Sequence, residues 1–452
     1  MMDIVIKNGT VINAGSMFRA DVGIRNGRII ALGEDLSGQE NIDASGKYIL
    51  PGLIETNAYL ESPFGNTRST DNFFKGSQAA AAGGVTTFID RVVPLPDESL
   101  HEAIRNRRDL ADPQVAVDYS LHICLPRLDE SSLAEIPGLV DQGYPSFEAM
   151  LYDPFPQQSL SEASLLRLMN AMQSSNSLLV LHCGSQALMQ HLRQQYPIPA
   201  EDESIPDYPR LWPSEAEAAS VLQVLSLAAH FETPLFLDGL STTASLDVLA
   251  HYHALPSQVN VSCHLHHLSH HETVYAQKDG RHYACLPPLR PAADSEALWR
   301  GLSAGLIQVV ASAHRGFTHA QKKLGQDLAA IPPGFANLSA LLPVLHDQGV
   351  AAKRFSMMYL VSLLSAFPAQ IFGLHQKGAV AIGKDADLVI FDPTARQTLS
   401  CAQMHTSSDF SIYEGEEVHG TVDMTFSRGK IVFDAGRFVG EQGAGQFISR
   451  RL

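Results

Sequence analysis

Paired cysteines, basic charge and long apolar runs are all scarce in this chain of 452 residues. The five cysteines are odd in number and form no CxxC pair, which argues against a disulfide framework and against a cysteine zinc site. Lys and Arg number 32 against 48 Asp and Glu, and the net charge of −16 disfavours nucleic acid and anionic membranes as partners. No apolar run reaches the length of a membrane span and no signal peptide is recognisable, so we expect no membrane partner and a cytoplasmic location.

The order of predicted strands and helices divides the chain into four parts. Residues 1–52 contain short strands separated by turns, and residues 53–374 alternate short apolar strands with helices. Strands return in residues 375–436, and residues 437–452 form a polar tail. Strand–helix alternation over about three hundred residues favours a parallel sheet closed into a (β/α)8, TIM-like barrel. We therefore predict an α/β fold in which both chain ends join in one small β-sandwich beside the barrel.

Several long motifs resemble those of one enzyme family. The stretch PGLIETNAYLE, which begins at Pro51, corresponds to a family strand of pattern PGxID-T-H-x-H-x-E, and AAAAGGVTTFID corresponds to AA-x-GG-T-T-x-ID. CLPPLRPAADSEALWRGL, RGFTHAQKKLGQDLAAIPPGF, GAVAIGKDADLVIFDP and the ending FVGEQGAGQF follow in the family order. On these motifs, nearly the whole chain resembles the dihydropyrimidinase/hydantoinase branch of the amidohydrolase superfamily. That branch also contains the collapsin response mediator proteins, which are not enzymes.

The resemblance implies hydrolysis of a cyclic amide by a hydroxide held between two divalent metals at the C-terminal mouth of the barrel. The family residues are two His on the first strand, a carboxylated Lys, a third and a fourth His, and an Asp. In the same order, these six positions fall at Asn57, Tyr59, Glu148, His182, Gly239 and Ala313, so that only His182 keeps the family residue. By the same resemblance, the substrate pocket has Tyr152 at the family Tyr, Leu286 in place of a Ser and Pro333 in place of an Asn.

These substitutions remove most of the donors that a metal pair requires. Asn offers a weak carbonyl ligand, and Tyr ligates only after its phenol, of pKa about 10, loses a proton. Ala313 lacks the carboxylate that would transfer the proton. We therefore predict no metal, no other cofactor and no catalytic residue at these positions, with His182 hydrogen-bonded to Glu148. The alternative is one divalent metal, such as zinc, at a remodelled site formed by His182 and Glu148.

A histidine-rich segment, SCHLHHLSHHE, could hold a relocated metal site. Here His264 and His266 could share a strand face, and His267 and His271 have helical i,i+4 spacing. We interpret the segment as a strand and loop without metal ligands.

Carboxylates near the strand ends form a second possible site. Glu55, Glu61, Glu148 and Asp238 could bind a harder ion through oxygen. Strand alternation places Glu55 on one face with Asn57 and Tyr59. The same rule turns Asp238 away from the face of Gly239, which weakens the oxygen site.

The sequence thus favours a non-catalytic homologue of dihydropyrimidinases and hydantoinases that acts as a scaffold, a regulatory protein or an assembly subunit. By resemblance, we expect a homotetramer, or a hetero-oligomer with an active paralogue or a pathway enzyme. One alternative is a cyclic-amide hydrolase of dihydropyrimidinase, hydantoinase, allantoinase or dihydroorotase type, working through His182 and Glu148. Another is a sensor that binds an uncharged small molecule at the barrel mouth.

Overall fold

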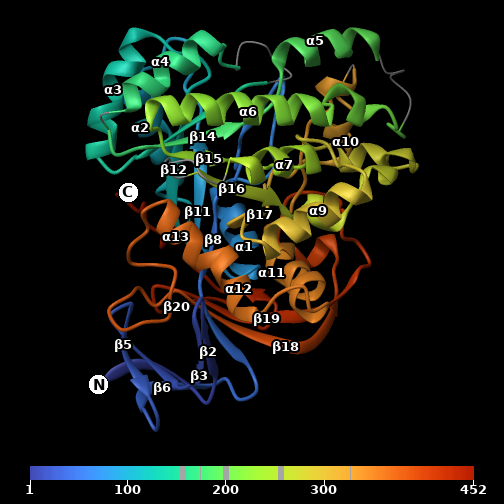
Figure 1. Cartoon of the computed structure of the whole chain (residues 1–452). Coiled ribbons are helices and arrows are strands. Elements are labelled where there is room, and N and C mark those ends of the chain that lie inside the picture. The colour runs from blue at the N-terminus through green and yellow to red at the C-terminus, as the bar shows by residue number, and fades with distance from the viewer. Residues whose placement is uncertain (153–158, 174, 197–202, 253–258, 326) are drawn as a thin grey trace.

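In a computed structural model of the whole chain, a barrel covered by helices lies against a β-domain that contains the N-terminus (Figure 1). The structure describes all residues except 153–158, 174, 197–202, 253–258 and 326. The predicted fold class is confirmed: eight parallel strands form the barrel, and strands from both chain ends form the second domain.

The barrel sheet has the order β17-β16-β15-β14-β13-β12-β11-β8. Its strands are β8 (Leu53–Glu55), β11 (Val85–Val92), β12 (Asp118–Cys124), β13 (Ser146–Met150), β14 (Leu178–His182), β15 (Leu235–Leu237), β16 (Val259–His264) and β17 (Val309–Ala311). A bridge between Ala58 and His314 joins the two edge strands just beyond their ends, so the barrel is nearly closed. Because the strands are parallel, their carboxyl ends meet at one mouth.

Helices cover the outside of the barrel, apart from the short α8, which follows β16 at the mouth. They are α1 (Phe73–Ala82), α2 (Leu100–Ala111), α3 (Glu130–Asp141), α4 (Glu162–Met172), α5 (Gln186–Gln195), α6 (Ser214–Phe231), α7 (Thr243–His251), α8 (Leu265–Ser269) and α9 (Ala292–Ser303). Several begin at a Ser, Thr, Asn or Asp whose side chain accepts a hydrogen bond from the first turn, as Ser99 does for α2 and Thr242 for α7. After β17 come α10 (His319–Lys322), α11 (Leu341–Leu345), α12 (Met357–Val361) and α13 (Phe367–Ile371).

The second domain contains two sheets. One has the order β5-β4-β1-β6 and the other β21-β20-β19-β18-β7-β2-β3. Their strands are β1 (Met2–Lys7), β2 (Thr10–Asn13), β3 (Ser16–Arg19), β4 (Asp21–Arg25), β5 (Arg28–Gly33), β6 (Gly38–Asp43), β7 (Tyr48–Pro51), β18 (Leu388–Thr398), β19 (Glu417–Ser427), β20 (Lys430–Asp434) and β21 (Arg437–Phe438). The N-terminal β7 pairs antiparallel with the C-terminal β18, which brings the two chain ends together. A two-stranded hairpin, β9 (Pro63–Phe64) and β10 (Thr67–Arg68), follows β8.

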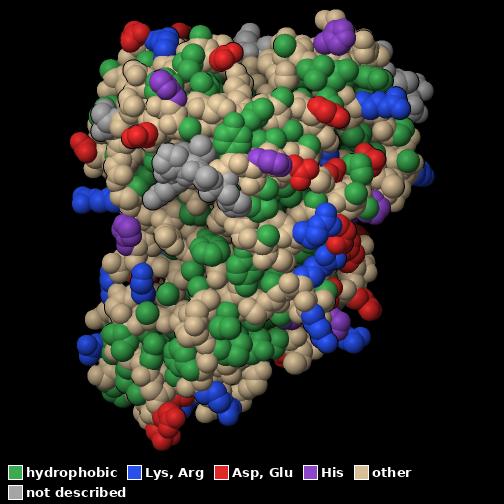
Figure 2. Space-filling model, viewed as in Figure 1, with side chains coloured by type: hydrophobic (Ala, Val, Ile, Leu, Met, Phe, Trp, Pro, Cys, Tyr) green, Lys and Arg blue, Asp and Glu red, His purple; other side chains and the backbone are tan. Residues whose placement is uncertain are grey.

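The C-terminal tail packs on the chain's own barrel. The amide of Tyr119 on β12 donates to the Gln446 carbonyl at 2.9 Å, and the amide of Ile448 donates to the Tyr119 carbonyl at 2.7 Å. Arg450 is fully buried beneath the barrel. Lys and Arg side chains lie interspersed with Asp and Glu on the face shown in Figure 2. Among the described residues, no helix is long and apolar enough to cross a membrane.

Candidate functional site at the barrel mouth

A pocket opens at the carboxyl ends of the barrel strands. Its lining includes most of the positions singled out from the sequence, namely Tyr59, Glu148, Tyr152, His182, Leu286, Ala313 and Pro333. Asn57 and Gly239 lie beneath this lining. Residues that the sequence had not indicated also contribute, in particular Arg91 and Arg315.

Arg91 is the centre of the polar cluster under the pocket. One terminal guanidinium nitrogen, Nη2, lies 2.6 Å from Glu148 Oε1, 2.9 Å from His182 Nε2 and 3.5 Å from Asp238 Oδ2. The guanidinium carbon lies 3.7 Å from the centre of the Tyr59 ring, which is a cation–π contact. Arg91 is the second-last residue of β11, and its side chain is 3% exposed. We name Arg91, Glu148, His182 and Asp238 the mouth cluster.

The predicted contact between His182 and Glu148 is present, with His182 Nε2 2.7 Å from Glu148 Oε1. Burial alone would raise the pKa of Glu148, but the charges of Arg91 and His182 outweigh burial and hold this pKa below its ordinary value. Burial also acts on Asp238, and there the hydrogen bond from His264 and the charges of His182 and Arg91 lower the pKa. Both carboxyl groups are therefore ionised at neutral pH, against one fixed positive charge.

The prediction that Asp238 points away from the site is wrong. Strand β15 ends at Leu237, and Gly239 has a φ of +71°, so strand alternation no longer applies to Asp238. The Asp238 carboxylate accepts hydrogen bonds from the Asn57 amide and from the Ser262 hydroxyl, the latter at 2.5 Å. Asp238 is thus one of the buried anions of the mouth cluster.

The imidazole of His264 occupies the space that a side chain at Gly239 would need. A Cβ built on Gly239 would lie 2.7 Å from His264 Nε2 and closer still to Cε1. His264 Nε2 is also 3.1 Å from the Asn57 amide nitrogen and 3.6 Å from Asp238 Oδ1. The histidine that the resemblance assigns to position 239 is therefore replaced in space by one from the next strand.

Glu55, Asn57 and Tyr59 do not form one set, contrary to the prediction from strand alternation. The Glu55 carboxylate accepts from the backbone amides of Asn57 at 2.7 Å and Ser312 at 2.8 Å, so it holds the strand ends together instead of lining the pocket. Only Tyr59 reaches the pocket. Strand β8 ends at Glu55, after which the period of two is lost.

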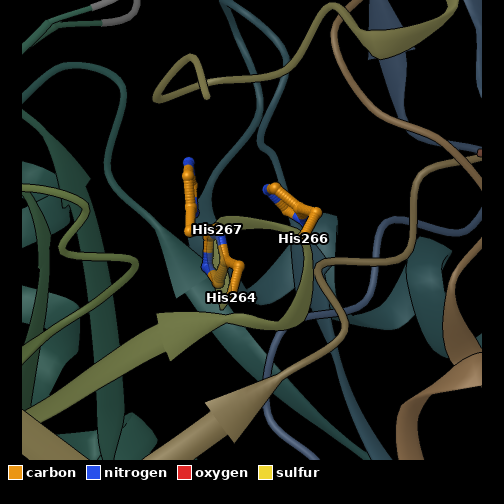
Figure 3. A group of neighbouring side chains, drawn as sticks. All are labelled: His264, His266 and His267. Atoms are coloured by element: carbon orange, nitrogen blue, oxygen red, sulfur yellow. The ribbon is translucent and has the colours of Figure 1, made fainter. Parts of the chain in front are cut away.

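The histidine-rich segment also differs from expectation. Strand β16 ends at His264 and α8 starts at Leu265, so His264 and His266 do not share a strand face. Helix α8 ends at Ser269, which removes the helical pairing of His267 with His271. The structure instead gathers His264, His266 and His267, all buried, each offering a ligand nitrogen within 4.8 Å of the others (Figure 3). We name these three residues the histidine cluster.

A pair of metal ions does not fit the six positions taken from the resemblance. Asn57, Tyr59, Gly239 and Ala313 supply no imidazole or carboxylate there. A metal bound by Glu148 and His182 would lie about 2.0–2.2 Å from each ligand, where the Arg91 guanidinium already sits. These six positions therefore lack the donors for hydrolysis through a metal pair.

Comparison with known proteins places the chain in a class. An amidohydrolase family model matches residues 48–432, and a model of the N-terminal domain of the urease alpha-subunit matches residues 1–47. The chain belongs to the amidohydrolase family.

Within that family it belongs to the dihydropyrimidinase/hydantoinase branch. It is 32% identical to a D-hydantoinase of Ralstonia pickettii over 100% of this chain and 99% of that protein. It is 34% identical to a D-phenylhydantoinase of Escherichia coli O1:K1, over 100% and 98% of the two chains. The crystal structure of a dihydropyrimidinase from Brevibacillus agri superposes with a TM-score of 0.95 at 31% identity, covering 100% of this chain and 99% of the other.

Proposed function

We propose that this hydantoinase-like protein binds an intact cyclic amide at the barrel mouth, as a regulatory or assembly protein, and does not open the ring through a metal-bound hydroxide. One observation carries the proposal: the Arg91 guanidinium lies within 2.6–3.5 Å of Glu148, His182 and Asp238. A guanidinium balances buried carboxylates as a cation does, but it cannot activate a water molecule as a Lewis acid.

The pocket supports a small cyclic amide as the ligand. Arg91 Nε and Nη1 are buried and have no hydrogen-bond partner in the described part of the chain, so they can donate to ring carbonyl oxygens. Leu286, Pro333 and Met150 add apolar walls suited to a flat ring. The relatives named above are hydantoinases and dihydropyrimidinases, which points to hydantoins and dihydropyrimidines as the ligand class.

The test measures binding and turnover on the same protein. Calorimetry with hydantoin, dihydrouracil, allantoin and dihydroorotate should detect a ligand that binds the wild type and binds Arg91→Met at least about tenfold more weakly, the loss expected for one charged hydrogen bond. Arg210→Met, at an exposed arginine, is the matched control and should bind normally. Chromatography of the same mixtures should show unopened rings. Ring opening that the double variant Glu148→Ala, His182→Ala abolishes would refute the proposal.

A second candidate function is hydrolysis of the same rings at a remodelled site with one ion. It is favoured by full-length similarity to hydantoinases and by the convergence of Glu148, His182 and Asp238. This second function requires the Arg91 side chain to move out of the mouth cluster, because its guanidinium lies between the ligands of the ion. Protein purified without chelators would then contain zinc or manganese that the double variant Glu148→Ala, His182→Ala does not retain, and added metal would stimulate ring opening.

The quaternary structure is part of the proposal. We propose a homotetramer, or a complex with an active paralogue or pathway enzyme, as the form in which a non-hydrolytic member would act. Light scattering after size-exclusion chromatography measures the mass directly, and co-expression with an active hydantoinase tests mixed assembly. A monomeric mass together with no association with the co-expressed hydantoinase would refute the proposed quaternary structure.

A further inference from the structure

The histidine cluster has the geometry of a metal site apart from the family position. Its ring centroids are 5.3 Å (His264 and His266), 5.8 Å (His264 and His267) and 4.4 Å (His266 and His267) apart. Nitrogens on a tetrahedral zinc ion lie about 3.3 Å from one another, so the widest pair, within 4.8 Å, closes by at most about 1.5 Å. Figure 3 shows one imidazole from the end of β16 and two from α8 grouped in this way.

Each imidazole of the cluster has one nitrogen engaged and one nitrogen without a partner. Within the described part of the chain, the unpartnered atoms are His264 Nδ1, His266 Nε2 and His267 Nδ1. A buried polar atom left without a partner is destabilising, and three on adjacent side chains is a concentration that packing alone does not explain. A cation with affinity for nitrogen is a partner that such atoms accept.

The engaged nitrogen of His267 faces a group that orients imidazole ligands in metal sites. His267 Nε2 is 3.1 Å from the Pro287 carbonyl, which can only accept, so this nitrogen carries the proton and Nδ1 presents its lone pair. His264 Nε2 lies 3.1 Å from the Asn57 amide nitrogen, with Asp238 Oδ1 at 3.6 Å, and His266 Nδ1 lies 3.4 Å from the Asn337 amide nitrogen. Because an amide nitrogen donates, a metal on the opposite nitrogens of these two rings requires both imidazoles to change tautomer when the ion binds.

The cluster can be reached from the mouth pocket. His264 and His266 line the mouth pocket, which gives an ion a route in and leaves a coordination position open to a pocket ligand.

We propose that His264, His266 and His267 bind a single borderline transition-metal ion, such as Zn²⁺ or Co²⁺, beside the position of the family metal pair. Three imidazole nitrogen donors suit this class of ion, whereas Mg²⁺ and Ca²⁺ prefer oxygen. The proposal does not depend on the function proposed above, because the mouth cluster and the unpartnered nitrogens of the histidine cluster are different atoms.

The test is a titration of tag-free, chelator-treated protein with Co²⁺, followed by visible absorption and by metal analysis after gel filtration. The wild type should bind one equivalent and give the strong bands of tetrahedral cobalt. His266→Gln and His267→Gln should each weaken binding by about 100-fold or more, beyond the loss expected for an outer residue. His271→Gln is the matched control, since that residue belongs to the same segment but bonds Thr273 Oγ1 at 2.7 Å. It should bind as the wild type does.

His182→Gln separates the two positions, because it removes a ligand of the family site only and should leave the cobalt bands unchanged. X-ray absorption on zinc-loaded wild type needs no variant and should report three imidazole nitrogens. Absence of uptake, unchanged affinity in both cluster variants, or loss of binding in His182→Gln would overturn the proposal. None of these results bears on whether Arg91 holds a cyclic amide, which calorimetry on metal-free protein measures separately.

Discussion

The two ends of the barrel each bury an arginine, and the surroundings of the two guanidinium groups are opposite in kind. Arg91 at the mouth lies against two carboxylates and a histidine. Arg450, from the C-terminal tail, lies at the floor and donates to uncharged oxygens, namely the hydroxyls of Ser120 at 2.8 Å and Ser146 at 2.6 Å and the Leu121 carbonyl. Burial lowers the pKa of Arg450 to about 9.

The difference shows what each arginine does. The floor arginine fastens the tail to β12 and β13 and has no carboxylate among the hydrogen-bonding groups that the structure gives it. The mouth arginine neutralises acids that are buried whether or not a ligand is present. Removal of Arg91 leaves buried carboxylates without a counter-charge, whereas removal of Arg450 leaves only uncharged polar groups without a donor. The two substitutions should therefore lower the free energy of unfolding by different amounts.

The largest effect is expected from Arg91→Met. This substitution leaves Glu148 and Asp238 ionised and buried without their guanidinium, and breaking such a pair costs about 3–5 kcal/mol. The free energy of unfolding, from urea titration, measures the loss. Adding Glu148→Gln removes one of the abandoned charges and should recover part of it. If the double variant were less stable than the sum of the two single changes, the pairing in the mouth cluster would be disproved.

Gly239→Ala should have the next largest effect, about 2–5 kcal/mol. A positive φ penalises a side chain by about 1–2 kcal/mol, and the collision with the His264 ring adds an overpacking cost of about 1–3 kcal/mol. Gly436→Ala is the matched control, because Gly436 has a φ of +81° and no atom within 4 Å of its added Cβ. The control isolates the backbone cost. In a His264→Ala background the two glycine substitutions should cost the same, and a persistent difference would contradict the steric explanation.

These residues also show how far the sequence could be used. The glycine, proline and apolar motifs of the scaffold are local, so the barrel and the shared β-domain were predicted correctly and the mouth was located. Arg91 was missed because TTFIDRVV is typical of an ordinary buried strand. An arginine inside an apolar strand was a signal that it has buried partners, but the sequence does not indicate that these are carboxylates from β13 and the end of β15.

Predictions that depended on periodicity failed where strands ended. Asp238 was turned to the wrong face because β15 stops at Leu237, and the histidine pairs were mismatched because α8 begins at Leu265. Strand and helix periods apply only within an element, and functional side chains lie just beyond strand ends in a barrel. His264 also lies at a strand end, so no sequence motif indicated that its imidazole occupies the space beside Gly239.

Arg450→Met should cost about 1–3 kcal/mol, which is less than Arg91→Met. The change removes hydrogen bonds from a charged group to two hydroxyls and a carbonyl, but it leaves no buried charge without a partner. Urea titration compares the two variants directly, and proteolysis of the tail reports whether residues near Ile448 have detached. Equal costs at the two ends would remove the distinction between a neutralising arginine and a fastening one.

The smallest effect, taken per pH unit, concerns Glu55, which holds β8 to the end of β17. Burial, only partly offset by the Ser312 and Asn57 amides, raises the pKa of Glu55 to about 7. Because the folded pKa exceeds the unfolded value of about 4.3, the folded state binds the extra proton, and this contribution to stability is complete below about pH 4.3 and is lost as pH rises through 7. Glu55→Gln should therefore make the unfolding free energy fall less steeply between pH 4.5 and 7, by up to about 1.4 kcal/mol per pH unit. The slope is the readout, since Gln lacks a second acceptor for the Ser312 amide and lowers stability at every pH. Identical slopes in the wild type and in Glu55→Gln would show that this buried carboxyl is ionised throughout the range, and the mouth would then contain one more anion for Arg91 to balance.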